Sequence, residues 1–152
     1  MKKNIFIENI NGNITSRPPV WFMRQAGRIL PSYLKLKQTY SFDEMMQNKE
    51  LAAKVTLLPL DDLGVDAGIL FSDILVIPKA LGLKLEFTAK GPKFHNALDE
   101  NINIENLKFN PQKLDYIYNN IREIKFQRPE TPLIGFCGGP LQHFCFCFEE
   151  MN

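Results

Sequence analysis

The sequence lacks long hydrophobic runs. Nowhere in its 152 residues do eighteen apolar side chains follow one another. A helix that crosses a bilayer needs about 20 apolar residues, so none is expected. Residues 1–8 contain a basic pair but no apolar stretch of the length that a signal peptide requires. We therefore expect a cytoplasmic protein that makes no contact with a membrane.

Cysteine is scarce. The three cysteines, Cys137, Cys145 and Cys147, all lie within eleven residues near the end of the sequence. An odd number in a protein that is not secreted argues against a disulfide framework. Cys145 and Cys147 lack the Cys-x-x-Cys spacing of zinc sites, and His143 alone adds little support. We interpret the three cysteines as small buried hydrophobic side chains and expect no metal.

The common catalytic motifs are absent as well. The sequence contains no P-loop, Gly-x-Gly-x-x-Gly, nucleophile elbow or His-Glu-x-x-His pattern. Nucleotide binding and serine or zinc hydrolysis therefore have no support. The two histidines, His95 and His143, are interpreted as surface or core residues rather than catalytic ones.

Charge is balanced overall but not along the chain. The net charge is +1, yet the first forty residues carry seven Lys and Arg against one acid, a net +6. Such a basic segment suits nucleic acid, an acidic membrane face or a small polyanion. These bases flank the apolar run Val20-Trp21-Phe22-Met23. That arrangement favours a pocket for a small anion and argues against nucleic acid.

Start and stop residues divide the chain into elements. Ser41 and Glu44 match a capping box, Gly64 is a typical helix stop, and Pro59 predicts a kink or break. We expect an irregular arm over residues 1–19, a helix from Pro31 to about Lys37, a longer helix from about Lys49 to Leu63, a hairpin within residues 84–94 and a helix that begins at Asn110-Pro111.

Three wholly apolar runs, at residues 20–23, 67–71 and 132–136, predict strands that are buried on both faces. Their alternation with amphipathic helices indicates an α/β fold with a parallel sheet covered by helices. Right-handed crossovers leave two architectures, an open doubly wound sheet or part of an eight-stranded barrel. We assign residues 1–152 to one domain.

Arginines follow the first predicted strand. In such folds the reacting groups lie beyond the carboxyl ends of the strands. Arg24-Gln25-Ala26-Gly27-Arg28 places two guanidinium groups around a turn that Gly27 makes possible. Each guanidinium can bind a carboxylate through two hydrogen bonds. The segment could bind an anionic ligand, or carry two solvated arginines.

Asp73 follows the second predicted strand and is surrounded in sequence by apolar residues. A carboxylate in such surroundings needs hydrogen bonds or a cation. It could cap the turn that follows, or point into a pocket as an acceptor of several hydrogen bonds.

These residues resemble the uroporphyrinogen decarboxylase family. The first signature is Pro19-Val20-Trp21-Phe22-Met23-Arg24-Gln25-Ala26-Gly27-Arg28, with Pro31 and Tyr33 after it. The family's next blocks follow in order as Leu51–Leu57, Gly64–Val76, Ala80–Leu83 and Gly91-Pro92. The resemblance covers nearly the whole chain.

The resemblance implies a (β/α)8 barrel that removes the four acetate carboxyl groups of uroporphyrinogen III and gives coproporphyrinogen III. It implies no metal or organic cofactor. Arg24 to Arg28 match the family's substrate-binding segment, and Arg24 and Asp73 are the catalytic candidates. Asp73 matches the aspartate that accepts hydrogen bonds from the four pyrrole N–H groups. As partner, the family implies a second copy of the chain in a homodimer.

The sequence departs from the family pattern in two respects. Phe146 stands where the family usually has a site tyrosine, after Gly138-Gly139-Pro140. A barrel of this type takes about 250 residues, so we expect 152 residues to hold an incomplete barrel: the first three strands, their helices and an inserted hairpin. Alone, the chain is expected to fold poorly and to be inactive, or to need a complementary C-terminal half.

Two other hypotheses stay open at this point. The chain could be a truncated, non-catalytic remnant that at most binds an anionic tetrapyrrole. It could also be a relative of cobamide-dependent methyltransferases with the same barrel, although the arginine segment argues against that. Nucleic-acid binding ranks last.

Overall fold

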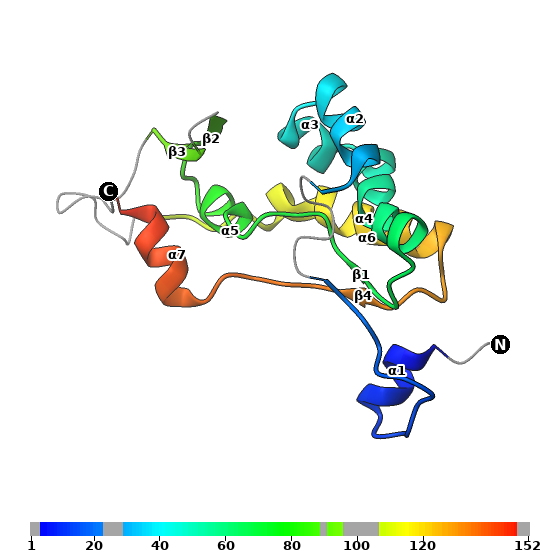
Figure 1. Cartoon of the computed structure of the whole chain (residues 1–152). Coiled ribbons are helices and arrows are strands. Elements are labelled where there is room, and N and C mark those ends of the chain that lie inside the picture. The colour runs from blue at the N-terminus through cyan, green and yellow to red at the C-terminus, as the bar shows by residue number, and fades with distance from the viewer. Residues whose placement is uncertain (1–3, 23–28, 89–90, 96–106, 149–152) are drawn as a thin grey trace. The chain divides into compact units, whose positions relative to one another are not determined.

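The computed structural model of the chain describes residues 4–22, 29–88, 91–95 and 107–148, and divides into two compact units. Unit 1 comprises Met1–Phe71 and Ile117–Gly135, and unit 2 comprises Ser72–Tyr116 and Phe136–Asn152. In chain order the elements (Figure 1) are α1 (Ile5–Ile10), α2 (Pro31–Thr39), α3 (Phe42–Gln47), α4 (Lys49–Leu63), β1 (Gly68–Ile69), α5 (Val76–Ala80), β2 (Leu85–Thr88), β3 (Gly91–Phe94), the 3-10 helix η2 (Pro111–Leu114), α6 (Asp115–Gln127), β4 (Leu133–Ile134) and α7 (Pro140–Cys147).

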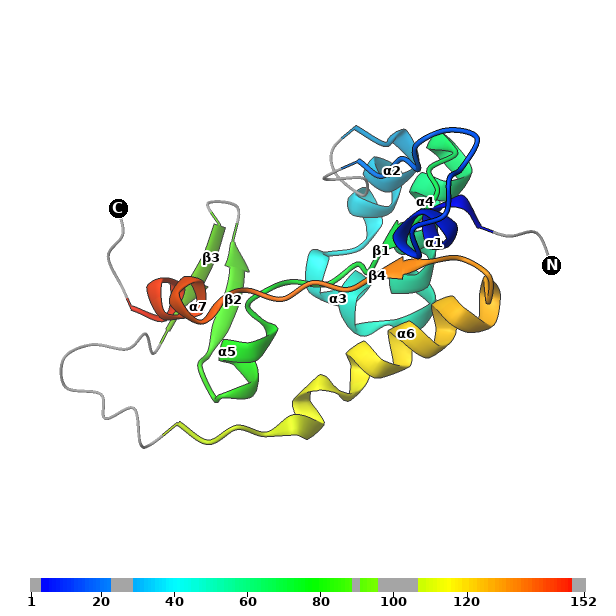
Figure 2. The same ribbon diagram turned by 90° about the horizontal axis from the view of Figure 1, so that it is seen from below.

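Unit 1 contains a parallel strand pair. β1 pairs with β4 in the register Gly68 with Leu133 and Ile69 with Ile134, and Figures 1 and 2 both show the two strands side by side. The Leu70 N–H continues the pairing by donating to the Ile134 carbonyl at 3.0 Å. The second and third predicted strands are therefore confirmed in their central residues, and so is the parallel pairing. The α/β class is confirmed with them. The predicted burial on both faces is wrong for the third strand, because Leu133 and Ile134 are only half-buried and Phe136 is exposed.

Two helices supply the core of unit 1. Apolar side chains of α4 and α6 pack with residues of the strand region in one cluster, which consists of Ala53, Leu57, Leu70 and Ile124 with Leu60, Ile117, Ile121 and Leu133 against it. The α6 members recur at spacings of three and four residues, so they share one helix face. The predicted helix after Asn110-Pro111 is thus confirmed, with η2 as its first turn.

Local capping explains where the helices begin and end. The Ser41 hydroxyl accepts from the Glu44 N–H at 3.2 Å, and a Glu44 carboxylate oxygen accepts from the Ser41 N–H at 2.8 Å, which confirms the capping box. Gly64 ends α4 with φ +65°, a left-handed conformation that glycine adopts without strain. Pro59 lies inside α4, so the predicted break is wrong, while a kink there stays a prediction. Its ring is fully buried, and this packing offsets the lost backbone hydrogen bond.

The first predicted strand is wrong over its described residues. Residues 20–22 form no strand, and Val20 and Phe22 are exposed; Met23 lies outside the described residues. Both backbone groups of Val20 bond to the single residue Asp66 instead of a neighbouring strand. Apolar character alone cannot supply the ladder partners that a strand requires.

The arm over residues 1–19 is also not wholly irregular, because it contains the helix α1. Asn4 caps this helix: its side-chain oxygen accepts from the Phe6 N–H at 2.9 Å. Asparagine is a favoured cap residue, so the start of α1 follows from a local signal that the sequence interpretation did not use.

Unit 2 contains the predicted hairpin. β2 and β3 pair antiparallel, with Leu85 opposite Phe94, and Figure 2 shows the two strands beside α5 and α7. The core of the unit consists of Leu75, Leu83, Phe94 and Cys147, with Ile74, Leu85, Leu107 and Phe148 packed against it.

The cysteines differ in their surroundings. Cys147 is buried, and burial raises the pKa of its thiol, as expected of an inert core residue. Cys145 is half-buried. Cys137 is exposed, so its interpretation as a buried side chain is wrong; it lies in the irregular segment between β4 and α7, where neighbours do not cover it. The described residues contain no cluster of three or more His, Cys, Asp or Glu that could hold a metal ion. None of the described helices has the length and apolar character needed to cross a bilayer.

Candidate functional site

The predicted anion-binding segment, Arg24-Gln25-Ala26-Gly27-Arg28, lies outside the described residues. Its role therefore stays a prediction. The residues on either side of it are described. Val20 bonds to Asp66, and Leu30 is buried at the start of α2 with only 2% of its surface exposed.

Asp73 lies in the turn between β1 and α5 and is half-buried. Its Oδ1 accepts a hydrogen bond of 2.7 Å from the Leu75 N–H. The Leu75 side chain is part of the core of unit 2, so this bond fixes the carboxylate to a packed element. Of the two interpretations of Asp73, capping of the turn that follows it is confirmed, and a role as a hydrogen-bond acceptor in a pocket stays a prediction. A turn held in this way can also present a carboxylate in one orientation.

A glycine and a histidine contact each other after β4. Gly138 is buried, and a Cβ atom added there would lie 2.7 Å from the Cε1 atom of the His143 ring. The ring belongs to α7 and is half-buried, and its Nδ1 atom is buried without a hydrogen-bond partner. Phe146 lies on the same helix and is 41% exposed. A glycine at 138 is therefore required for the imidazole to lie against the backbone.

This contact leads to a prediction for Gly138→Ala. The added methyl group should lower the free energy of unfolding by about 1–3 kcal/mol, the usual cost of overpacking. Gly139→Ala is the matched control, because a Cβ atom there meets nothing within 4 Å and the backbone φ of −69° suits any residue. Urea unfolding of both variants measures the difference. Equal unfolding free energies would contradict the predicted contact.

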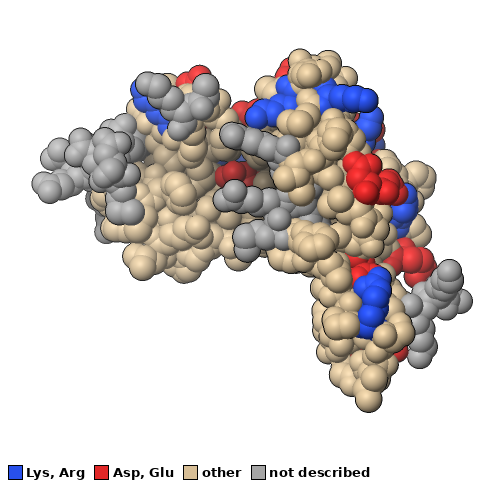
Figure 3. Space-filling model, viewed as in Figure 1, with Lys and Arg blue, Asp and Glu red and all other residues tan. Residues whose placement is uncertain are grey.

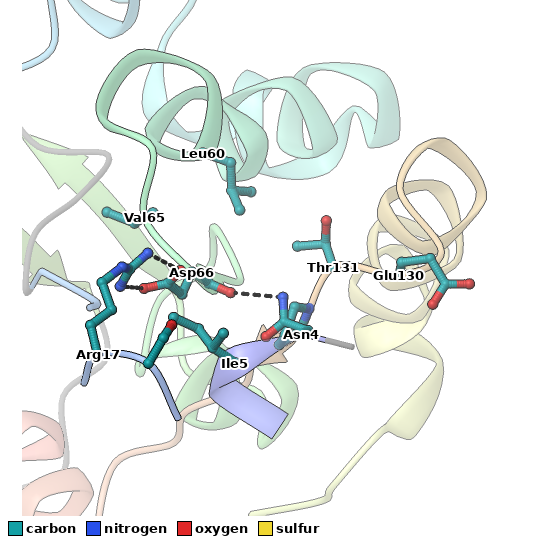
Figure 4. Close-up of a pocket in the computed structure, with 10 residues that line it drawn as sticks. Asn4, Ile5, Arg17, Leu60, Val65, Asp66, Glu130 and Thr131 are labelled. Carbon is teal, nitrogen blue, oxygen red and sulfur yellow. Dashed lines mark hydrogen bonds and ion pairs between the residues drawn. The ribbon is translucent and has the colours of Figure 1, made fainter. Parts of the chain in front are cut away.

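The sequence interpretation missed an ion pair. Arg17 donates from Nη1 to Oδ2 of Asp66 at 2.7 Å and from Nη2 to Oδ1 at 2.8 Å (Figure 4). The Val20 N–H also donates to Oδ2, at 2.6 Å. We name these three residues the arm anchor. The two charged partners are 49 residues apart in sequence. No spacing or motif signals such a contact, although Asp66 does stand immediately before an apolar run.

The arm anchor borders a cavity of about 480 Å³ in unit 1. Figure 4 shows how its labelled residues surround it; the lining consists of Asn4, Ile5, Ser16, Arg17, Leu60, Val65, Asp66, Glu130, Thr131 and Pro132. Asp66 precedes β1 and Pro132 precedes β4, so the cavity lies at the amino ends of these strands. In parallel α/β folds the reacting groups lie at the opposite, carboxyl ends. The cavity is therefore not the predicted substrate pocket.

The arm anchor predicts a pH dependence of stability. The hydrogen bond from Arg17 is the largest factor that holds the pKa of Asp66 below its ordinary value, and the Val20 N–H adds to it. A depressed folded-state pKa stabilises the protein above the ordinary carboxyl pKa, and this contribution is lost as the pH falls through the folded-state value. The wild-type chain should therefore lose stability more steeply below about pH 4 than Asp66→Asn.

The measurement for this prediction is the urea midpoint at several pH values between 2 and 7. The Ser41–Glu44 capping box also lowers the pKa of Glu44 and contributes with the same sign in both proteins. Only the difference between the wild-type chain and Asp66→Asn therefore reports on Asp66. Parallel curves for the two proteins would contradict the prediction.

Comparison with known proteins identifies the family. The model of the uroporphyrinogen decarboxylase family matches residues 1–151. Among similar proteins named uroporphyrinogen decarboxylase, that of Christiangramia forsetii is 38% identical over 98% of this chain and 45% of its own length. Those of Legionella pneumophila strain Lens and Helicobacter pylori strain HPAG1 are 42% and 46% identical, over 98% and 90% of this chain.

The chain spans less than half of these relatives, since the match covers 44% of the Legionella protein and 41% of the Helicobacter protein. Among solved structures, a methyltransferase from Methanosarcina mazei superposes with a TM-score of 0.69 over 95% of this chain and 44% of its own. That similarity, at 19% sequence identity, is one of fold alone. On the match over residues 1–151, the chain belongs to the uroporphyrinogen decarboxylase family.

Proposed function

We propose that the chain forms the N-terminal part of a uroporphyrinogen decarboxylase, a carboxy-lyase of porphyrin and heme biosynthesis. The enzyme would remove the four acetate carboxyl groups of uroporphyrinogen III and give coproporphyrinogen III. The observation that carries this proposal is the family match over residues 1–151. The parallel pairing of β1 with β4 fits the first part of a (β/α)8 barrel. The remaining strands would come from residues outside this sequence.

Asp73 would act at the centre of the substrate. A carboxylate has about four lone-pair sites, and the Leu75 N–H bonds to one of its oxygens. In the proposed complex the carboxylate accepts hydrogen bonds from the pyrrole N–H groups. Protonation of a ring carbon by an arginine or a bound water gives a cationic pyrrole, which the negative charge of Asp73 stabilises. Preorganised charge of this kind commonly contributes several kcal/mol.

Arg24 and Arg28 would bind the rim of the substrate. Uroporphyrinogen carries eight carboxylates, and a guanidinium group remains charged and matches a carboxylate in shape. Gln25, Ala26 and Gly27 complete the proposed binding segment. Loss of the acetate carboxyl groups as carbon dioxide needs no metal or organic cofactor in this scheme.

A binding titration tests the proposal. Uroporphyrin, the oxidised form of the substrate, is titrated against the chain and followed by porphyrin fluorescence. We expect saturable binding that weakens as salt is added, because the contacts are ionic. Coproporphyrin, which lacks the four acetates, is the matched control and should bind more weakly. A chain with native circular dichroism that binds neither porphyrin would contradict the proposal.

Further expectations about the whole protein stay predictions. These are a homodimer, a complementary C-terminal half as partner, and a cytoplasmic location. The non-catalytic alternative would be favoured if the chain bound uroporphyrin but a completed barrel released no coproporphyrinogen.

A further inference from the structure

The imidazole of His143 lies against the backbone that follows β4. A Cβ atom added at Gly138 would lie 2.7 Å from its Cε1 atom and 2.8 Å from its Nε2 atom, so the half-buried ring occupies the space that this glycine leaves free. The Nδ1 atom is buried and has no hydrogen-bond partner among the described residues. A proton on Nδ1 would therefore lack an acceptor, which is costly for a buried polar group. The neutral ring then carries its proton on Nε2, as a hydrogen-bond donor.

Helix α7 places this ring near the turn that holds Asp73. His143 and Cys147 are four residues apart in α7, so they lie on one face of the helix, about 5.4 Å apart along its axis. Cys147 packs in the same core cluster as Leu75, and the Leu75 N–H is the donor that orients the Asp73 carboxylate. Helices α5 and α7 are in contact, and Figures 1 and 2 both show them side by side. The imidazole thus lies one helical turn from the cluster that supports Asp73.

The strand register agrees with this placement. Ile69 of β1 pairs with Ile134 of β4, and Asp73 and Gly138 follow these two residues by the same number of positions along the chain. In parallel α/β folds the reacting groups follow the carboxyl ends of neighbouring strands. Asp73 and the glycine next to the imidazole therefore occupy equivalent positions after two paired strands.

We propose that His143 is a substrate-binding residue that shares a site with Asp73: its Nε2–H donates to a carboxylate on the rim of the tetrapyrrole, while Asp73 accepts from the pyrrole N–H groups. This inference rests on the proposed function and adds to it a donor on α7. A hydrogen bond from a ring N–H to a carboxylate is of the strong, charge-assisted kind. The sequence interpretation treated His143 as a surface or core residue, because its placement depends on how α7 packs in unit 2.

Proton NMR of the full 152-residue chain tests the contact directly. The chain contains two histidines, His95 and His143, and the Hε1 signal of His143 is assigned by its absence from His143→Gln. This signal should move as uroporphyrin is added, with the Kd that the fluorescence titration gives. His95 is the internal control, because it is exposed on the hairpin and bonds to Glu86 at 2.8 Å. In Asp73→Asn, the same movement of the His143 signal should need about 10- to 100-fold more uroporphyrin, since one molecule contacts both residues.

The Kd of substituted chains tests the hydrogen bond. His143→Phe should raise the Kd for uroporphyrin about tenfold, the effect of losing one hydrogen bond to a charged group. His143→Gln keeps an N–H donor and should stay within about threefold of the wild-type value. His95→Phe is the matched control and should leave the Kd unchanged. The number of binding sites is read from the same titration, because a purely structural defect lowers the folded fraction but not the Kd of the folded molecules.

The outcomes separate the two ideas. A wild-type chain that binds uroporphyrin while its His143 signal moves no more than that of His95 would overturn the role of His143 and leave the proposed function intact. An unchanged Kd for His143→Phe would do the same. Should His143→Phe not fold, the NMR titration of the wild-type chain still decides. A wild-type chain that binds no porphyrin would overturn the proposed function and the role of His143 with it.

Discussion

Asp73→Asn should weaken uroporphyrin binding by about 10- to 100-fold and abolish coproporphyrinogen formation in a completed barrel. The variant removes the negative charge, and a hydrogen bond to a charged group is worth about 1.5–3 kcal/mol. The asparagine side-chain oxygen can still accept from the Leu75 N–H, the bond that the carboxylate makes at 2.7 Å. The turn before α5 should therefore keep its conformation. Fluorescence titration measures the binding, and near-ultraviolet circular dichroism checks the fold.

Asp115→Asn is the matched control for this variant. Asp115 belongs to the same compact unit and is exposed in the first turn of α6. Its substitution changes the net charge of the chain by the same amount and should leave the Kd for uroporphyrin unchanged. Equal affinity of Asp73→Asn and the wild-type chain would remove the central role proposed for Asp73.

The C-terminal part of a relative should stabilise the chain and create decarboxylase activity. Mixing the chain with the part of the Legionella protein that it does not match supplies the remaining strands of the proposed barrel. Among the described residues of unit 2, the large apolar side chains that are exposed and could be buried by a partner include Leu141, Phe144 and Phe146 of α7 and Phe136 before it. Figure 3 shows the surface over α7 without charged side chains. Burying each such side chain contributes about 1.5–3 kcal/mol, which raises the melting temperature by about 10 °C or more.

The assay for this prediction is calorimetry of the mixture together with coproporphyrinogen formation, which neither part alone should give. Phe144→Asp should reduce both effects, since burying an unpaired charge is costly. Ile14→Asp is the matched control, because Ile14 is fully exposed on the arm. Decarboxylation by the chain alone would contradict the incomplete barrel.

Apart from the parallel pairing of the strands, what could be predicted from the sequence was local. The capping box at Ser41 and Glu44 and the stop at Gly64 involve residues a few positions apart, so their patterns appear directly in the sequence. The apolar run at residues 20–22 predicted a strand that the structure does not contain. Hydrophobicity indicates that a segment avoids water, but it does not indicate which groups will bond to its backbone. At Val20 the backbone N–H bonds to the Asp66 carboxylate and not to a neighbouring strand.

The candidate site also combines a local contact, which the sequence indicates, with a contact between distant residues, which it does not indicate. Asp73 was found from its position after an apolar run, and the bond that orients it comes from a residue only two positions away. The Arg17–Asp66 pair depends on how the arm returns to β1, which no local pattern encodes. The charge excess of the first forty residues pointed to the arginines as a group, but it did not separate Arg17, which pairs with an acid, from the others.

Unit 1 is built from two stretches of chain, and this affects how it forms during synthesis. The apolar face of α4 contacts Ile124, and β1 pairs with β4, yet Ser72–Tyr116 is translated between these partners. At about 5–20 residues per second, the ribosome needs several seconds to make the intervening residues. During that interval α4 and β1 have been synthesised, but α6 and β4, which pack against them, have not. The nascent chain therefore exposes the apolar face of α4 and the edge of β1 before α6 and β4 have been synthesised. A chaperone that binds apolar segments would be most useful at this stage.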